Sequence, residues 1–225
     1  MGLTDSLSLS RTSDNVNDAF FSGGVIPDAD RREAALWIAG RQGLPGAYAR
    51  MFAPTEQDYR EGAKVYTGEK VNSGGATGHV LGEEACRALA LLGTDDPVVA
   101  QAFDSARAGI MERLGPDFDQ HGKYCCGTCT SSFWRHISAQ GFGKHEAWVT
   151  AGLATLKRSR LEGGKWRVFP FYYTVLALQG FDSPAVLEEL RYAAPALEHS
   201  LKRRDSGDVY ARRRGALAER VLARV

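Results

Sequence analysis

The chain has 225 residues, of which 44% are hydrophobic and 24% are charged, with a net charge of +1 and a pI near 7.7. This size and composition are typical of a globular protein with a large core, and the near-neutral charge makes nucleic acid an improbable partner. No apolar run reaches the roughly 20 residues that a membrane-spanning helix needs. We therefore expect a cytoplasmic protein, and the abundance of Ala, Arg and Gly is typical of a bacterial one.

The first 24 residues are polar and lack the basic and then apolar order of a secretory signal. They predict a frayed tail over residues 1–24. Residues 25–225 are expected to form a single helical-repeat domain.

Apolar residues recur at helical spacing, whereas alternating β-branched stretches are hard to find, so the pattern predicts an all-α fold. In chain order, the predicted helices cover residues 28–42, 56–65, 77–92, 96–114, 125–140, 144–160, 170–180, 183–203 and 208–224. Thr55 with Asp58 resembles a capping box, and Asp96 and Ser183 each precede a proline in a first helical turn.

Two stretches are expected to depart from regular helix. Residues 60–79 form the least helical internal stretch, and their glycines predict a flexible loop. Pro195 lies inside a predicted helix, where it removes a backbone hydrogen bond, so we expect a kink or a break there.

An internal repeat is visible in the glycines that follow apolar runs, as helix C-caps do. "ALALLGTDDPVV" and "VLALQGFDSPAV" place Gly93 and Gly180 87 residues apart, and Gly141 lies between them in "HISAQGFGKHEAWV". "GKY" at 122–124 and "GKW" at 164–166 each precede the first helix of a unit. The period of about 39 to 48 residues predicts antiparallel helical hairpins that stack side by side, with all first helices lining one surface.

The segment "GGKWRVFPFYYTVLAL" at residues 163–178 resembles the repeat of the prenyltransferase and terpene-cyclase α/α-toroid families. The resemblance covers about residues 75–203. It implies helical hairpins in an α/α-toroid-like arc, with first helices around a cavity for an apolar, isoprenoid-like molecule. Four or five hairpins are fewer than a full ring usually has, so we expect an open arc or a ring that a homodimer completes.

The acidic motifs of those families are missing from the chain. "DFDQ" at residues 117–120 lacks the last carboxylate of DxDD, the DDxxD pattern does not follow Asp95, and Asp-x-Cys does not occur. The resemblance therefore implies a ligand groove and leaves catalysis open.

Two polar stripes lie on predicted first helices. His79, Glu83 and Cys86 share one face of helix 77–92, opposite its apolar stripe. If first helices are neighbours, this face and the stripe of Cys125, Cys129 and His136 on helix 125–140 would share a groove. The expected ligand-groove residues are His79, Glu83, Cys86, Tyr172, Tyr173 and Trp166.

The cysteine stretch "YCCGTC" has three interpretations. Cys125, Cys129 and His136 at helical spacing could hold zinc. A thiol at a helix N-terminus could act in redox or nucleophilic chemistry, because the helix dipole lowers its pKa. The preferred interpretation is packing of small residues at a crowded turn, with Cys126 inward and no cofactor.

Two functions of different classes follow. The first is a helical-repeat protein with a groove for an apolar small molecule. The alternative is a non-catalytic helical-repeat module that presents its concave surface to a partner protein.

Overall fold

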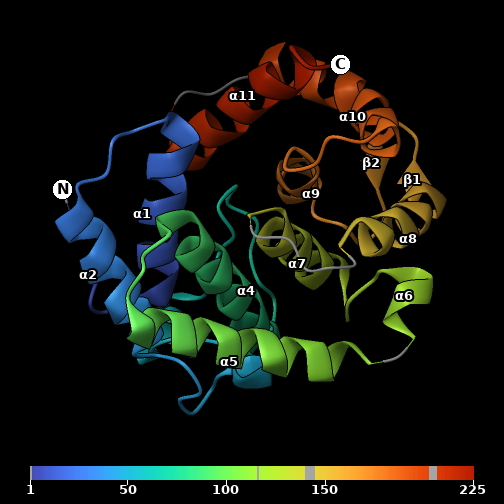
Figure 1. Cartoon of the computed structure of the whole chain (residues 1–225). Coiled ribbons are helices and arrows are strands. Elements are labelled where there is room, and N and C mark those ends of the chain that lie inside the picture. Colours follow the sequence, from blue (N-terminus) through green and yellow to red (C-terminus); the bar gives the residue numbers. More distant parts are fainter. Residues whose placement is uncertain (1, 116, 140–144, 203–206) are drawn as a thin grey trace. The chain divides into compact units, whose positions relative to one another are not determined.

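The structure is a computed structural model that describes residues 2–115, 117–139, 145–202 and 207–225 (Figure 1). Over these residues the chain is predominantly helical, with one short 3-10 helix and one antiparallel pair of two-residue strands. The all-α prediction is confirmed. Nowhere in the described ranges does a helix combine the length and the apolar character needed to cross a bilayer.

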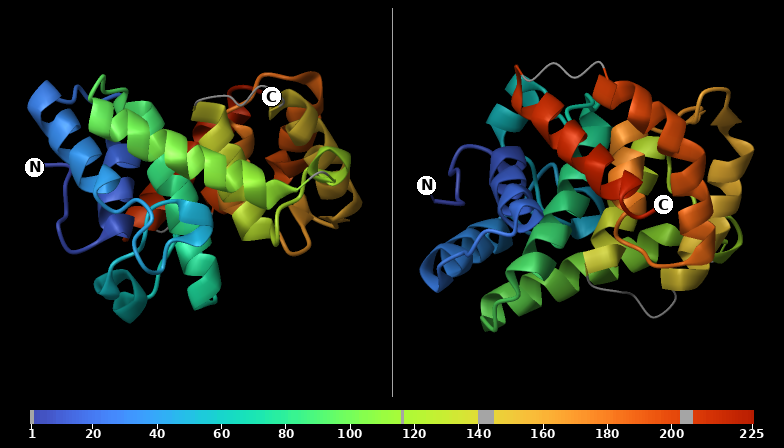
Figure 2. Two further views of the ribbon diagram at one scale, coloured as in Figure 1. Left: turned by 60° about the horizontal axis from the view of Figure 1, so that its bottom comes forward. Right: turned by 90° about the horizontal axis from the view of Figure 1, so that it is seen from above.

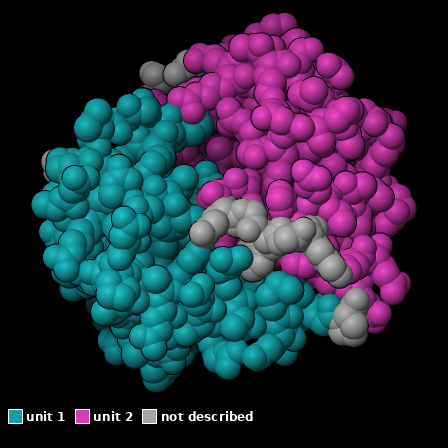
Figure 3. Space-filling model, in the orientation of Figure 1, with its two compact units in different colours: residues 1–64, 70–115 teal, residues 65–69, 116–225 magenta. Residues whose placement is uncertain are grey.

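The chain forms two compact units (Figure 3). Unit 1 comprises residues 1–64 and 70–115, and unit 2 comprises residues 65–69 and 116–225. The expected boundary between a tail and a single domain at residue 24 is therefore wrong, because residues 1–24 belong to unit 1.

Unit 1 contains two helical hairpins joined by an irregular segment. Its helices are α1 (Leu9–Ser22), α2 (Asp28–Ala39), the 3-10 helix η1 (Tyr48–Arg50), α3 (Glu56–Glu61), α4 (Gly74–Leu92) and α5 (Pro97–Leu114). Helix α1 packs on α4, and α2 packs on both α4 and α5. First helices thus contact each other, as do second helices, which is the contact pattern of stacked hairpins.

The predicted frayed tail is in fact helix α1. The carboxylate of Asp58 accepts hydrogen bonds from the hydroxyl of Ser8 (2.6 Å) and from the backbone N–H groups of Leu9 (3.1 Å) and Ser10 (3.2 Å). Leu9 and Val16 are fully buried. The N-cap is Ser8, whose hydroxyl accepts from the backbone N–H of Arg11 at 3.0 Å, so the sequence held a local start signal that the prediction did not use. Asp58, about 50 residues further along the chain, adds bonds that no local pattern reveals.

Unit 2 repeats this arrangement. Its elements are α6 (Phe118–His121), α7 (Gly127–Ala139), α8 (His145–Arg158), β1 (Arg160–Leu161), β2 (Lys165–Trp166), α9 (Phe171–Leu178), α10 (Pro184–Lys202) and α11 (Val209–Leu222), which Figure 2 shows from two further sides. First helices α7 and α9 pack together, second helices α8 and α10 do the same, and α11 packs on α10. Closure of the hairpins into an arc stays a prediction.

Most predicted caps are confirmed. Thr55 and Asp58 form a capping box, the side chain of Asp96 caps α5 ahead of Pro97, and Gly93 ends α4 in the left-handed conformation. The predicted cap Gly141 lies outside the described residues. Helix α10 runs through Pro195 without a break, so a break at that position is wrong.

Residues 65–69 form a short strap within unit 2. Val65, Tyr66 and Thr67 are at most 2% exposed. The guanidinium of Arg213 lies 4.1 Å from the centre of the Tyr66 ring and donates a hydrogen bond to the Tyr66 carbonyl at 3.1 Å. The prediction of a flexible loop is wrong for this part of residues 60–79, because aromatic and cationic side chains of α11 hold it.

Candidate functional site

Three cysteines gather where α7 begins. The helix starts at Gly127, and the carbonyl of Cys126 accepts its first backbone hydrogen bond from Thr130 at 2.9 Å. Cys126 is therefore the N-cap, and its sulfur accepts from the backbone N–H of Cys129 at 3.4 Å. The acceptor in an N-cap side chain is normally an oxygen that bonds the N–H of the second or third helical residue. Here the sulfur of Cys126 is that acceptor.

The side chains of the three cysteines are hydrogen-bonded to one another, and no disulfide joins them. The Sγ atoms of Cys125 and Cys129 lie within 4.8 Å of each other. Hydrogen bonds from the thiols of Cys125 and Cys129, followed by those from the backbone N–H groups of Cys129 and Thr128, lower the pKa of Cys126 to about 2. The same thiol hydrogen bonds raise the pKa of both donors above the usual range. One thiolate, that of Cys126, is thus stabilised between two thiols.

Exposure decreases along the cluster. Cys125 is exposed, Cys126 is half-buried and Cys129 is fully buried. The prediction that Cys126 packs inward is wrong, because it precedes the helix and caps it, and Cys129 is the cysteine that packs inward. A solvent-accessible thiolate therefore lies next to a buried thiol.

The loop before α9 packs against this helix start. A Cβ atom on Gly127 would lie 2.0 Å from the carbonyl oxygen of Val168 and 2.8 Å from Cα of Phe169, so only glycine fits there. Val168 has a φ of 59°, which is a strained conformation for a β-branched residue. Phe169 anchors the loop through a ring stacked on Trp134, with centroids 6.2 Å apart.

The predicted zinc set of Cys125, Cys129 and His136 does not form. His136 is fully buried on α7, seven residues after Cys129, which corresponds to about 10 Å along a helix. Cys126, which the sequence interpretation left out of the set, takes part in the sulfur contacts instead. The signal that identifies it is the Cys-x-x-Cys spacing ahead of a helical run.

In unit 1, His79, Glu83 and Cys86 share the predicted face of α4. His79 and Glu83 are at most 1% exposed, and Nε2 of His79 lies 3.7 Å from Oε1 of Glu83. Burial raises the pKa of the Cys86 thiol well above its usual range, and the Glu83 carboxylate raises it further. The ring of Tyr48 stacks on His79, with centroids 4.2 Å apart. Within unit 1, Tyr48 therefore covers His79 on this face.

Glycines hold the segment that carries Tyr48. Cβ atoms built on Gly78 and Gly109 would lie 2.8 Å from the carbonyl oxygen of Gly46 and 1.9 Å from that of Ala49. Ala49 and Arg50 both have positive φ values, 50° and 55°. The sequence analysis missed this segment because the close approach depends on glycines about 30 to 60 residues away.

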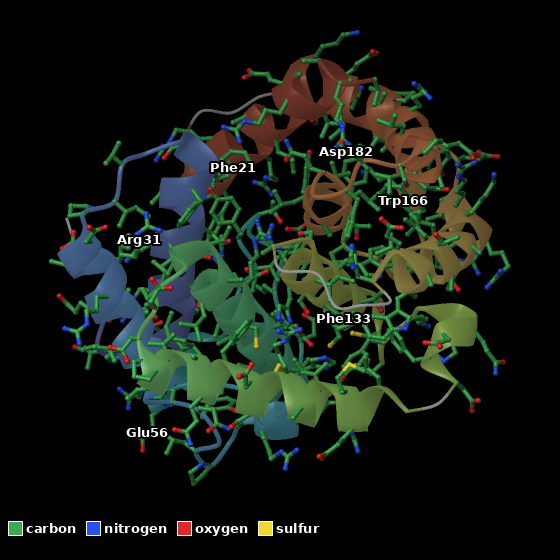
Figure 4. The ribbon with its side chains drawn as sticks, viewed as in Figure 1. Phe21, Arg31, Glu56, Phe133, Trp166 and Asp182 are labelled. Carbon is green, nitrogen blue, oxygen red and sulfur yellow. The ribbon has the colours of Figure 1, made fainter. Side chains whose placement is uncertain are left out.

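The other predicted groove residues lie in unit 2. Tyr173 is fully buried beneath the guanidinium of Arg135, 5.5 Å from the ring centre. Trp166 (Figure 4) is 3% exposed and donates from Nε1 to Glu189 at 2.9 Å, which explains it as a core residue. Tyr172 is half-buried and lines a hollow of about 620 Å³. The hollow is also lined by Glu162, Gly163, Lys165, Pro195, Ala196, His199 and Ser200.

The site residues thus form two groups, one in each unit, and the expectation that both stripes face a common groove stays a prediction. Comparisons with protein-family models, with curated proteins and with solved structures find no match for this chain. The chemistry of the cysteine cluster therefore has to be inferred from its own geometry. A stabilised, half-buried thiolate beside a buried thiol can attack a disulfide and then resolve the mixed disulfide.

Proposed function

We propose that the chain performs thiol–disulfide exchange at the start of α7, with Cys126 as the nucleophile and Cys129 as the resolving thiol. The observation that supports this proposal is the position of Cys126 as an N-cap that accepts hydrogen bonds from both neighbouring thiols and from the helix backbone. Such donors stabilise a thiolate, which is the attacking form of cysteine.

The reaction balances with a disulfide as the second reactant. The Cys126 thiolate attacks one sulfur of the substrate disulfide, forms a mixed disulfide and releases the other sulfur as a thiolate. Cys129 then transfers its proton to that leaving thiolate or to solvent and attacks Sγ of Cys126. The Cys126–Cys129 disulfide forms, the second substrate sulfur leaves as a thiolate, and the substrate is reduced by two electrons.

The hydrogen bonds also set the direction of exchange. A stabilised thiolate favours the reduced protein and is a good leaving group. The steps above therefore run forward only with an excess of substrate disulfide. The favoured direction is their reverse, in which the Cys126–Cys129 disulfide oxidises a dithiol. This direction follows from donors that exist only when Cys125 and Cys129 carry protons.

A redox titration tests the proposal. Fully reduced protein is equilibrated with mixtures of reduced and oxidised glutathione that extend to a large excess of the oxidised form, quenched in acid and mapped by peptide mass spectrometry. We expect a Cys126–Cys129 disulfide that disappears in Cys126→Ser and in Cys129→Ser but not in Cys86→Ser, the buried-cysteine control. If Cys126 and Cys129 stay unoxidised, or if purified protein carries a stoichiometric metal ion on these sulfurs, the proposal is wrong.

The second candidate is the groove for an apolar, isoprenoid-like molecule that the family resemblance implies, with a protein-binding module as its non-catalytic alternative. Its support is the packing of first helix α7 on first helix α9. The hollow beside Tyr172 contains charged side chains, which favours a polar ligand there. Native mass spectrometry of the purified protein tests this candidate, because bound lipid, bound metal and oligomeric state are read together.

A further inference from the structure

The backbone of the loop between β2 and α9 approaches the start of α7 closely. Val168 is 69% exposed, and its carbonyl packs on Gly127, the residue that follows Cys126. Strained backbone persists only where the surroundings fix it. On one side of Val168, the ring of Phe169 stacks on Trp134. On the other side, the backbone N–H of Arg167 donates to the carbonyl of Ser159 at 2.7 Å. These two contacts fix the backbone of Val168.

Two basic residues are close along the chain, one to Val168 and one to Cys126. Arg167 precedes Val168 and is exposed, and half-buried Lys123 lies three residues before Cys126. Two carboxylates, those of Asp119 and Glu69, are already bonded, whereas Glu162, five residues before Arg167, is exposed. Asp119 accepts from Nε1 of Trp148 at 2.5 Å, and Glu69 accepts from the backbone N–H of Tyr173 at 3.0 Å. The start of a helix also favours negative charge.

We propose that the substrate of the exchange reaction is an anionic peptide disulfide, which docks an apolar group on Val168 and its carboxylates on Arg167 and Lys123. This inference rests on the proposed function, because it names the substrate class of the same site. Bound in this way, the substrate disulfide lies at the end of α7 that carries Cys126, and the bonds formed and broken are those given above. Complementary charge raises the association rate, and the increase falls as ionic strength rises.

The test compares three disulfides with the reduced full-length protein: oxidised glutathione as the anionic peptide, hydroxyethyl disulfide as the neutral compound and cystamine as the cationic one. The second-order rate of Cys126–Cys129 oxidation is measured by acid quench and alkylation at low and high salt. We expect the order anionic, neutral, cationic at low salt, with the differences reduced at high salt.

Variants test the two contacts separately. Arg167→Gln should lower the ratio of the anionic to the neutral rate by about two- to fivefold, the effect of one exposed ion pair. Val168→Gly keeps the backbone, because glycine adopts positive φ readily, and should lower the same ratio by removing the apolar group. Arg191→Gln, an exposed arginine on α10, should leave the ratio unchanged.

The outcomes separate this inference from the function on which it rests. If none of the three compounds oxidises the pair, exchange itself is refuted and the substrate class with it. If all three react at equal rates, or if Arg167→Gln and Val168→Gly match Arg191→Gln, exchange stands and the anionic peptide is refuted.

Discussion

The thiolate of Cys126 accepts hydrogen bonds from two thiols and two backbone N–H groups, which lower its pKa to about 2. An ordinary thiol has a pKa of about 8.5, so its reaction with iodoacetamide accelerates about tenfold per pH unit below that value. Because Cys126 is already ionised, its alkylation rate should stay flat between pH 5 and 8. Timed alkylation followed by peptide mass spectrometry measures this rate.

Cys125→Ser provides the control for that profile. It weakens the first of the donors that lower the pKa of Cys126, so the pKa should rise and part of the pH dependence should return. A tenfold rise per pH unit at Cys126 in the unmodified protein would show that the thiolate is not stabilised.

A second prediction concerns the close approach of the loop backbone to Gly127. A Cβ atom there would collide with backbone atoms of Val168 and Phe169, which cannot rotate away as a side chain would. Gly127→Ala should lower the free energy of unfolding by about 1–3 kcal/mol, as overpacking does. Gly75→Ala is the matched control, since its Cβ meets no atom within 4 Å, and it should be neutral or slightly stabilising. Equal denaturation midpoints for the two variants would contradict the close approach.

For the cysteines, the predicted start of the helix was wrong by two residues. The prediction that "YCCGTC" opens a helix was correct to within that shift. The helix begins at Gly127 and not at residue 125, so Cys126 lies ahead of the first turn and caps it. Cys129 and His136 share a helical face, but seven residues separate them by about 10 Å along the axis, too far for both to bind one zinc ion.

Helix α9 is capped by a residue that is distant in sequence, because the carboxylate of Glu69 accepts a hydrogen bond from a backbone N–H in its first turn. Its N-cap is Pro170, which has no side-chain hydrogen bond, and Glu69 accepts from the N–H of Tyr173 instead. Glu69→Ala should lower the free energy of unfolding by about 1–2 kcal/mol, the usual effect of losing a cap. Glu69→Gln, which keeps an oxygen acceptor, should cost less. Urea denaturation measures both, with the exposed residue Glu198→Ala as the control. Equal losses for Glu69→Ala and Glu198→Ala would refute this capping role.

Elements with local signals were predictable, and elements with distant partners were not. Nine of the observed α-helices lie at predicted positions, because the apolar periodicity and the capping residues occur within or beside each helix. Helix α1 has local caps in Ser8 and Gly23, but the bonds of its first turn to Asp58 are long-range. The strap at 65–69 is held by Arg213, and no local pattern reveals either distant partner.

At the scale of the whole molecule, hairpin stacking appears in both units, although only three repeats were visible in the sequence. The hairpin α1–α2 was not recognised as a repeat unit, because α1 was predicted as a tail and the GK-aromatic marker is missing before it. Gly23 nevertheless ends α1 in the left-handed conformation, as Gly93 ends α4. The packing of this hairpin on α4 and α5 follows the same pattern without that marker. The repeat is thus a property of helix packing more than of sequence identity.

The division of the chain leads to a final prediction, because unit 2 is not continuous in sequence. Residues 65–69 supply Glu69 to the start of α9 and the Tyr66 ring to Arg213, and Gly68, at a φ of 94°, packs against the ring of Tyr210. A fragment of residues 116–225 lacks these contacts and exposes the surfaces that they bury. It should unfold at a lower temperature than the same fragment fused to residues 60–72 through a flexible linker. The control is the fusion with Tyr66→Ala and Glu69→Ala, which should melt like the bare fragment in circular dichroism. If all three melt together, the strap contributes nothing to unit 2.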